Sequence, residues 1–320
     1  MVNSPVVADL SLFALTVGAP SVFSEFQLRL LPHTPHDLVD RGIGVAVRVR
    51  LRKMTVYYES FGRGRLFVGL HGFAPDHRLM KGCLEPVFRR RKGWRRIYPD
   101  LPGMGKTSAK DSIVNSDEMF EVVLEFLDKV VPNQRIVLAG ESYGGYLARA
   151  VTQNKHRLVD GLLLICPMII ADREKRNLPQ PKVLLEDPEF LSTLGEKDLA
   201  DFKPGHVVLT RGIWERFSRE VLPGLRAADS KVLEIIMKEG YAFSFDLEAY
   251  CRTFEKPSLL LAGRQDSSVG YSDAWSIMDK YPRMTFAVLD KAGHDLQIEQ
   301  ERLFEALVNE WLDRVEESTS

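Results

Sequence analysis

The sequence of 320 residues predicts an α/β protein with a mostly parallel central sheet, helices on both faces and an inserted helical segment. Short β-rich runs alternate with amphipathic stretches along most of the chain, an order that is typical of parallel sheets. The alternation stops between residues 167 and 245, where short helical patterns and turns follow one another. Four apolar runs, each bounded by glycine, proline or charge, predict buried strands: RIVLAG, LVDGLLLI, SLLLAG and TFAVL.

The first predicted elements form a hairpin and a strand–helix–strand unit. Residues 45–52 alternate between apolar and polar side chains with period two, and residues 55–62 are the expected hairpin partner. A short apolar run over 65–70 predicts the next strand. A helix from about residue 77 to 91 then leads to a strand over 95–99.

Two longer helices have a clear apolar face. Ser116 is the expected N-cap of the first helix, which carries acids in its first turn. A last amphipathic helix is expected from about Ile298 to Val315. The apolar face of the first helix is formed by Met119, Val122, Val123, Phe126 and Leu127.

These elements divide the chain into three parts. Residues 45–166 and 246–320 are expected to form the core, and residues 167–245 a cap inserted over the carboxyl edge of the sheet. Residues 1–44 form an N-terminal extension that fits an accessory segment, an oligomer contact or a start codon placed too far upstream. A secretory signal is not expected, because Asp9 interrupts the apolar run and no basic residue precedes it.

The composition is that of an ordinary globular protein, with 45% hydrophobic residues, 27% charged residues and a formal net charge of −1. This balance gives no electrostatic reason to expect nucleic acid or an anionic membrane as a partner. No apolar run approaches the roughly 18 residues that span a bilayer. The basic run from Arg89 to Lys92, followed by Arg95 and Arg96, is interpreted as a solvated helix end.

The three cysteines, Cys83, Cys166 and Cys251, are far apart and show neither metal-ligand spacing nor a disulfide framework. This usage is typical of a reducing compartment. We therefore expect a cytoplasmic protein without a structural metal. The sequence leaves the oligomeric state open, a homo-oligomer included.

The stretch DLPGMGKTS, Asp100 to Ser108, nearly matches a phosphate-binding loop. In such a loop a glycine stands where this chain has Asp100, a carboxylate at the place of an anion. Pro102 also removes one backbone donor. The next helix is expected only near Ser116, so its dipole and its N–H groups do not reach this loop. We therefore expect no nucleotide binding.

The sequence GESYGG, Gly140 to Gly145, lies directly between a predicted strand and a predicted helix. In the pattern G-x-S-x-G, the serine of a sharp strand-to-helix turn presents its hydroxyl above the sheet. The glycines are needed because side chains would clash in so tight a turn. An ordinary glycine-rich connection is the alternative, but the strand and helix on either side favour Ser142 as a nucleophile.

A serine nucleophile needs a base and an acid. Among the seven histidines, His294 follows a predicted strand near the C-terminus and lies on a glycine-containing loop. His71 also follows a strand, but it precedes the serine in the chain. Asp266 lies shortly beyond the strand SLLLAG, so that Ser142, Asp266 and His294 come in the order of an α/β-hydrolase catalytic site. Asp172, after the preceding strand, is the alternative acid.

These residues carry a resemblance to the α/β-hydrolase superfamily over about residues 45–316, and to its serine carboxylesterase-like branch with a helical cap. GESYGG resembles the nucleophile elbow, GRQD the acid loop and AGH the histidine loop of that family. LHGF, residues 70–73, is similar to its oxyanion loop. YPDLPGMGKTS resembles its loop after the fourth strand, where the glycines shape the backbone. Residues 167–245 match its variable cap.

The resemblance implies an acyl transfer in which Ser142 attacks, His294 is the base and Asp266 orients the ring. It also implies an oxyanion hole formed by the backbone N–H groups of Phe73 and Tyr143. No metal or cofactor is implied. The expected substrate is a small-molecule ester of small to medium acyl chain, cleaved through an acyl-enzyme intermediate. Four aromatic residues either wall the acyl pocket or pack within the cap: Trp214, Phe217, Tyr241 and Phe243.

Other functions on the same fold are the alternatives. Haloalkane dehalogenases and epoxide hydrolases have an aspartate where this chain has Ser142, which excludes them. GESYGG is also similar to serine carboxypeptidases, but three scattered cysteines do not supply their disulfides. A proline iminopeptidase-like peptidase needs acidic cap residues, and a lactonase uses the same catalytic residues as an esterase. A ligand receptor of this fold can lose the histidine that is present here as His294. The candidate acids for a peptidase are Glu186, Asp187 and Glu215.

Overall fold

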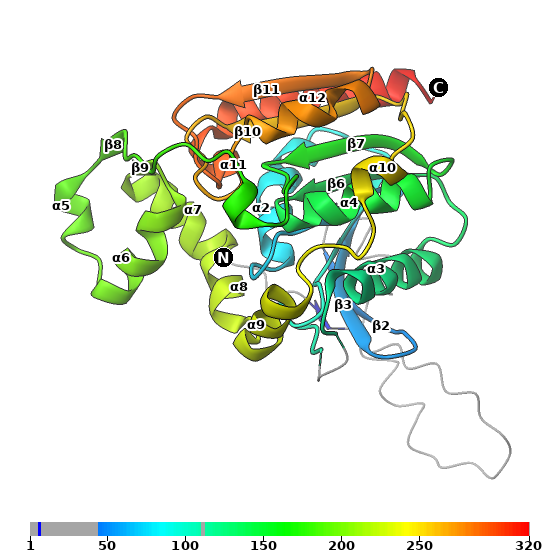
Figure 1. The fold of residues 1–320 in the computed structure, drawn as a ribbon, viewed down its shortest axis with the longest axis horizontal. Helices are drawn as coiled ribbons and strands as arrows, with labels where there is room; N and C mark the ends of the chain where they lie inside the picture. The colour runs from blue at the N-terminus through cyan, green and yellow to red at the C-terminus, as the bar shows by residue number, and fades with distance from the viewer. Residues whose placement is uncertain (1–5, 8–43, 110–112, 320) are drawn as a thin grey trace, which may run out of the picture.

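The computed structural model describes residues 6–7, 44–109 and 113–319, so most of the predicted extension 1–44 lies outside the described residues. Within the described part, a nine-stranded sheet runs through the centre of the molecule (Figure 1) in the order β1-β2-β3-β5-β4-β6-β7-β10-β11. The predicted α/β class is confirmed. The strands are β1 (Val6–Val7), β2 (Val45–Arg50), β3 (Thr55–Phe61), β4 (Arg65–Leu70), β5 (Trp94–Pro99), β6 (Ile136–Glu141), β7 (Val159–Ile165), β10 (Ser258–Gly263) and β11 (Met284–Leu289).

The sheet is mixed: β1 runs parallel to β2, two antiparallel pairs follow, and the rest is parallel. β2 and β3 form the predicted hairpin, with Val45 opposite Ser60, and β3 runs antiparallel to β5. From β5 through β4, β6, β7 and β10 to β11, every pair is parallel. Because parallel strands end at the same edge, the loops that follow β4, β6, β10 and β11 all meet there.

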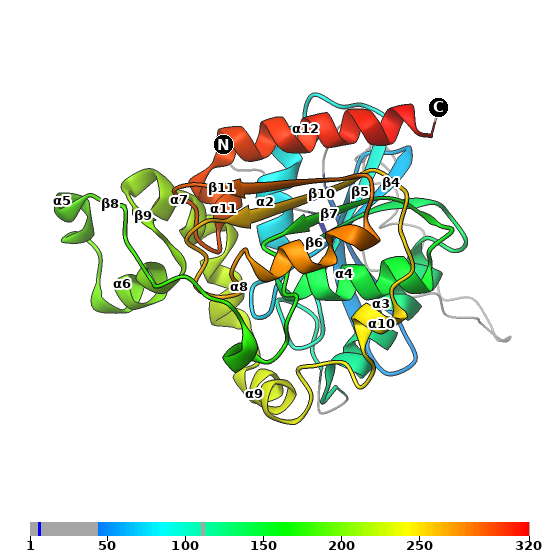
Figure 2. The same ribbon diagram turned by 45° about the horizontal axis from the view of Figure 1, so that its top comes forward.

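Helices cover both faces of the sheet (Figure 2). α2 (His77–Phe88) and α12 (Glu301–Glu317) pack together on one face, and α3 (Ser116–Val130) and α4 (Tyr143–Asn154) on the other. The predicted apolar face of α3 is buried. The predicted N-cap is wrong by one residue, because Asn115 caps the helix and the Ser116 hydroxyl instead bonds the carbonyl of Tyr241.

The central strands of the sheet are buried, whereas the last strand is only partly covered. Every residue of β6, β7 and β10 is buried, in agreement with their continuous apolar runs. β11 was expected to be buried but is mostly half-buried, because it is the last strand of the sheet. The final helix is broken at Gln300 into α11 (Leu296–Glu299) and α12.

The chain between β7 and β10 forms a separate group of short elements. In Figure 1, α5, α6, β8 and β9 extend to the side of the sheet's carboxyl edge, while α7, α8 and α9 return toward it. None of the helices in the described ranges is both long and apolar enough to cross a membrane. The elements are β8 (Leu185–Glu186), α5 (Pro188–Leu191), α6 (Glu196–Phe202), β9 (Val208–Leu209), α7 (Arg211–Glu220), α8 (Leu222–Ala227), α9 (Ser230–Glu239) and α10 (Leu247–Tyr250).

Candidate active site

Ser142 joins β6 to α4 with a φ of 51°, in a region that non-glycine residues rarely adopt. This backbone conformation costs about 1–3 kcal/mol, and it persists only because the surrounding structure holds the residue in place. The neighbouring glycines make the turn possible, because a Cβ on Gly140 would collide with the carbonyl of Gly144. A Cβ on Gly144 would collide with the carbonyls of Leu70 and His71. The turn holds Ser142 at the carboxyl edge of the sheet, where 8% of the residue is exposed.

The structure brings together the three side chains that the sequence analysis singled out. Nε2 of His294 lies 3.0 Å from Oγ of Ser142, and Nδ1 of His294 lies 2.9 Å from Oδ2 of Asp266. These residues follow β6, β10 and β11, whose parallel ends meet at one edge. The alternative acid, Asp172, is instead exposed and pairs with Lys175 at 3.0 Å.

Asp266 is fully buried and ionised. Its Oδ1 accepts the backbone N–H groups of Ser268 at 2.8 Å and Val269 at 3.1 Å. Burial opposes its charge, but the imidazole of His294 and these two donors hold the pKa of Asp266 below its ordinary value. A carboxylate that faces Nδ1 keeps the ring proton on that nitrogen. When the ring is neutral, the lone pair of Nε2 faces the serine hydroxyl, which is the arrangement that can accept a serine proton.

The loop after β4 packs against this turn. Among the described residues, the backbone N–H groups of Phe73 and Tyr143 donate to no other backbone group. His71 fixes the loop, since its Nδ1 lies 2.8 Å from the carbonyl of Gly72 and its Nε2 accepts the N–H of Leu101 at 2.9 Å. Burial lowers the pKa of His71, so that the ring is neutral and donates through Nδ1. Sequence reasoning considered His71 only as a base and missed this contact.

A cavity of about 170 Å³ opens beside His294. The loop after β10 forms one wall, and segments 181–183 and 203–207 form the other. The side chains that line it are neutral or basic, with hydroxyl and amide groups from Gln265, Ser267 and Ser268. Of the three side chains brought together here, only His294 lines the cavity; Ser142 and Asp266 do not.

The four aromatic residues expected near an acyl pocket do not line this cavity. Trp214 and Phe217 belong to an aromatic cluster with Phe202, whose ring lies 5.4 Å from Trp214 and 5.6 Å from Phe217. The two others stack on residues of the elbow helix: Tyr241 on Tyr143 at 5.3 Å, and Phe243 on Tyr146 at 4.2 Å.

The histidine loop is bonded to the segment that walls the cavity. Glu299 accepts the backbone N–H of Gly293 at 2.5 Å with one oxygen. With the other oxygen it accepts those of Val207 at 2.6 Å and Val208 at 2.9 Å. Burial raises the pKa of Glu299 to about 7. The spacing of Glu299 in the sequence gives no sign of this role, because its partners lie far away in the chain.

The stretch that resembles a phosphate-binding loop is closed by Asp100. Its Oδ2 accepts the N–H of Lys106 at 2.8 Å, and its Oδ1 lies 2.7 Å from Nδ1 of His77. Gly105 has a φ of 55°, and a Cβ there would collide with the Asp100 carboxylate. The carboxylate therefore fills the place of the anion, and the glycines shape the backbone. Both ring nitrogens of His77 face carboxylates, since Nε2 lies 3.0 Å from Glu59.

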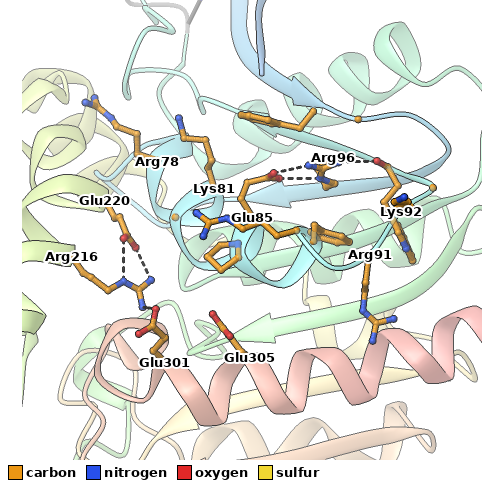
Figure 3. Close-up of a pocket in the computed structure, with 18 of the residues that line it drawn as sticks. Arg78, Lys81, Glu85, Arg91, Lys92, Arg96, Arg216, Glu220, Glu301 and Glu305 are labelled. Carbon is orange, nitrogen blue, oxygen red and sulfur yellow. Dashed lines mark hydrogen bonds and ion pairs between the residues drawn. The ribbon is translucent and has the colours of Figure 1, made fainter. Parts of the chain in front are cut away.

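Figure 3 shows a larger groove of about 1360 Å³, lined by α2, β5, α7 and α12, which neither Ser142 nor His294 lines. Nine basic and four acidic side chains line it, but many of the basic groups are paired. Arg96 pairs with Glu85 at 2.6 Å and Arg216 with Glu220 at 2.7 Å. Arg91 was expected in a solvated helix end, but it bonds Asn309 and Asp313 of α12. Arg91 thus joins the end of α2 to α12, Arg96 joins β5 to α2, and the pair of Arg216 and Glu220 lies within α7.

The fold and this site define the class of protein. A profile of the family described as the alpha/beta hydrolase fold matches residues 65–301, about three quarters of the chain. The chain belongs to the α/β-hydrolase family, as its sequence motifs predicted.

Individual relatives are similar over most of their length. The chain is 23% identical over 265 residues to the AB hydrolase superfamily protein YisY of Bacillus subtilis, covering 80% of this chain and 94% of that protein. It is 25% identical over 248 residues to the pimeloyl-[acyl-carrier protein] methyl ester esterase of Aeromonas salmonicida, covering 75% and 92%. The crystal structure of an alpha/beta superfamily hydrolase from Oenococcus oeni is 27% identical, with a TM-score of 0.76, covering 84% and 99%.

Proposed function

We propose that this chain is a serine hydrolase that cleaves carboxylic esters of small to medium acyl chain through an acyl-enzyme intermediate. The observation that carries the proposal is the pair of contacts made by His294, 3.0 Å to Ser142 and 2.9 Å to Asp266. Relatives that are named esterases, such as the methyl ester esterase of Aeromonas salmonicida, support the reaction class.

In the proposed mechanism, Oγ of Ser142 attacks the ester carbonyl while its proton passes to Nε2 of His294. Asp266 keeps the ring oriented and stabilises the imidazolium. The imidazolium then protonates the leaving alkoxide. A water molecule that gives its proton to His294 attacks the acyl carbonyl, and the acid leaves as Ser142 regains its proton.

The developing negative charge on the substrate oxygen needs donors. We propose the backbone N–H groups of Phe73 and Tyr143 for this role, because neither donates to another backbone group in the described structure. The contact of the His71 ring with Gly72 supports a fixed position for the first of them. Losing one such donor typically lowers the rate about 10²–10³-fold.

The cavity beside His294 is small, and Ser142, Phe73 and Tyr143 do not line it. Ligand sites for drug-sized molecules typically hold about 300–1,000 Å³, and this cavity holds about 170 Å³. We propose residues 45–166 and 246–320 as the hydrolase core and residues 167–245 as the cap that limits the cavity. A lactone would fit the same mechanism. The acids considered for a substrate amine, Glu186, Asp187 and Glu215, do not line this cavity.

Turnover of a short-chain p-nitrophenyl ester tests the proposal. Purified protein is expected to release p-nitrophenol, and Ser142→Ala is expected to lose about 10³-fold or more of kcat with an unchanged circular dichroism spectrum. A fluorophosphonate should add once to the wild type, at Ser142, and not to the variant. Wild-type protein that neither turns over esters nor reacts with the fluorophosphonate would contradict the proposal and favour a receptor.

A further inference from the structure

Glu141, the residue before Ser142, is a carboxylic acid placed against the catalytic base. It is the last residue of β6 and only 1% exposed. Its Oε1 lies 3.3 Å from Nε2 of His294, the same nitrogen that faces Oγ of Ser142. Its Oε2 lies where a Cβ on Gly72 would stand, and the backbone N–H of Gly72 favours the charged form of the carboxyl group. The proposed mechanism makes no use of this carboxyl group.

Within the described ranges, the ionisable groups that interact with Glu141 come from five neighbouring elements. Of these groups, the imidazole of His294 is the one that can become positive. Burial raises the pKa of Glu141, and the Asp295 and Asp266 carboxylates raise it further. The groups are His294 and Asp295 after β11, Asp266 after β10, Cys83 on α2, Cys166 after β7, and Tyr241 before α10.

A buried carboxylate and a buried imidazolium are each costly alone, but their pair carries no net charge. We propose that Glu141 is a second acid of the site, whose carboxyl shares one proton with the ring of His294, so that the free base appears only when this proton leaves. The inference rests on the proposed function, because it assumes that His294 is the base for Ser142. The resting pair then holds its proton either on Nε2 or on the carboxyl group.

Proton sharing has a kinetic consequence. The carboxylates of Asp266 and Glu141 together raise the pKa of His294, against the effect of burial. Ester cleavage needs the neutral ring, so activity should fall as the pH drops through a midpoint well above the ordinary histidine value of about 6.5. Because Glu141 and His294 titrate together, the midpoint is an apparent pKa of the two groups and not the pKa of His294 alone.

The direct test is the titration of the His294 ring by NMR in the Ser142→Ala protein, with and without Glu141→Gln. Glutamine keeps the shape of the side chain and removes its charge. An opposite charge within about 4–6 Å shifts a pKa by roughly 1–3 units. Removing the charge of Glu141 should therefore lower the titration midpoint of the His294 ring by at least about one pH unit, a tenfold loss of proton affinity. A midpoint that glutamine does not change would overturn the proposal.

The second test is the pH profile of kcat/KM in the enzyme with Ser142 intact. At low pH, kcat/KM falls as the His294 ring takes up its proton, and this part of the profile is the acid limb. Glu141→Gln should move the acid limb to lower pH, and Glu141→Asp, which keeps a charge, should move it less. Glu220→Gln is the matched control: this buried acid pairs with Arg216 at 2.7 Å and does not contact the ring, so the midpoint of the limb should stay in place. Lower activity in Glu141→Gln without a shift of the limb would show a packing role and contradict the proposal.

These two readouts separate the inference from the proposed function. The NMR titration needs no turnover. If the wild-type protein has no esterase activity, the proposed function is wrong, but the titration midpoint of the His294 ring still decides whether Glu141 shares its proton. If Glu141→Gln fails to fold, Glu141→Asp in the Ser142→Ala background gives the same comparison. A smaller fall of the midpoint would support the proposal, and an unchanged midpoint would again overturn it.

Discussion

His294 Nε2 and Ser142 Oγ lie 3.0 Å apart although 152 positions of the sequence separate them. The contact is built by the sheet, because β6 and β11 end at the same edge and deliver their loops to one place. Neither side chain needs to move for the serine proton to reach the ring. Changes at the groups that hold this pair should therefore be visible mainly in kcat.

Asp266→Asn should abolish most of the activity without unfolding the protein. An amide can donate to Nδ1 and favour the wrong tautomer, a change that lowers kcat about 10⁴-fold in a serine protease. Steady-state kinetics with a p-nitrophenyl ester measures the effect. Asp172→Asn is the control, because that acid pairs with Lys175 at the surface. Equal losses in the two variants would show that Asp266 has no special role.

His71→Ala should slow the reaction by loosening the loop that carries Phe73. The ring accepts the N–H of Leu101 at 2.9 Å and contacts the carbonyl of Gly72 at 2.8 Å. We expect kcat to fall by about 10–10²-fold, below the effect of losing an oxyanion donor outright, with a smaller change in KM. His156→Ala, whose ring contacts the carbonyl of Thr253, is the control. A change in KM alone would indicate a binding role for the loop.

Gly144→Ala should disrupt the elbow. Its Cβ would collide with the carbonyls of Leu70 and His71, and backbone on both sides leaves no flexible group to yield. We expect a loss of about 1–3 kcal/mol in the free energy of unfolding and loss of esterase activity. Chemical denaturation measures the first. Gly212→Ala on α7 is the matched control, because a Cβ there meets nothing within 4 Å. A stable and active Gly144→Ala would show that the turn is not tightly packed.

The sequence predicted much of the fold because its signals are local. Buried parallel strands are continuous apolar runs, and strand ends in a parallel sheet share one edge, so Ser142, Asp266 and His294 could be placed together. Their catalytic roles remain predictions. The N-cap of α3 was missed by one residue, since Asn115 and Ser116 are both good caps and distant partners of the serine decided between them.

Contacts between distant side chains could not be predicted in this way. Glu141 is an unconstrained position of the pattern G-x-S-x-G, and only the approach of the histidine loop brings it to 3.3 Å from the ring. Glu299 bonds three backbone N–H groups from two other segments, and no periodicity marks it. The partial exposure of β11 likewise follows from its place at the edge of the sheet. That place depends on the strand order, which the apolar run of one strand does not reveal.

A second buried histidine predicts a pH dependence of stability that is separate from catalysis. His77 lies between Asp100 at 2.7 Å and Glu59 at 3.0 Å, and all three side chains are buried. Burial opposes the charge on the ring, but the two carboxylates raise the pKa of His77 to about 9. In the unfolded chain the value is about 6.5. The folded protein therefore binds this proton more tightly than the unfolded chain does.

Stability from this group should be fully present below pH 6.5 and lost as the pH rises through 9. The expected loss in the free energy of unfolding is at most about 3 kcal/mol, measured by urea denaturation at a series of pH values. His294 also has a raised pKa and adds a loss of the same sign, so the wild type must be compared with His77→Gln. That variant should be less stable at pH 6 and show a weaker fall toward pH 9.5. An identical fall in both proteins would mean that His77 is neutral in the folded state, donates to one of the two acids and accepts from the other in its protonated form.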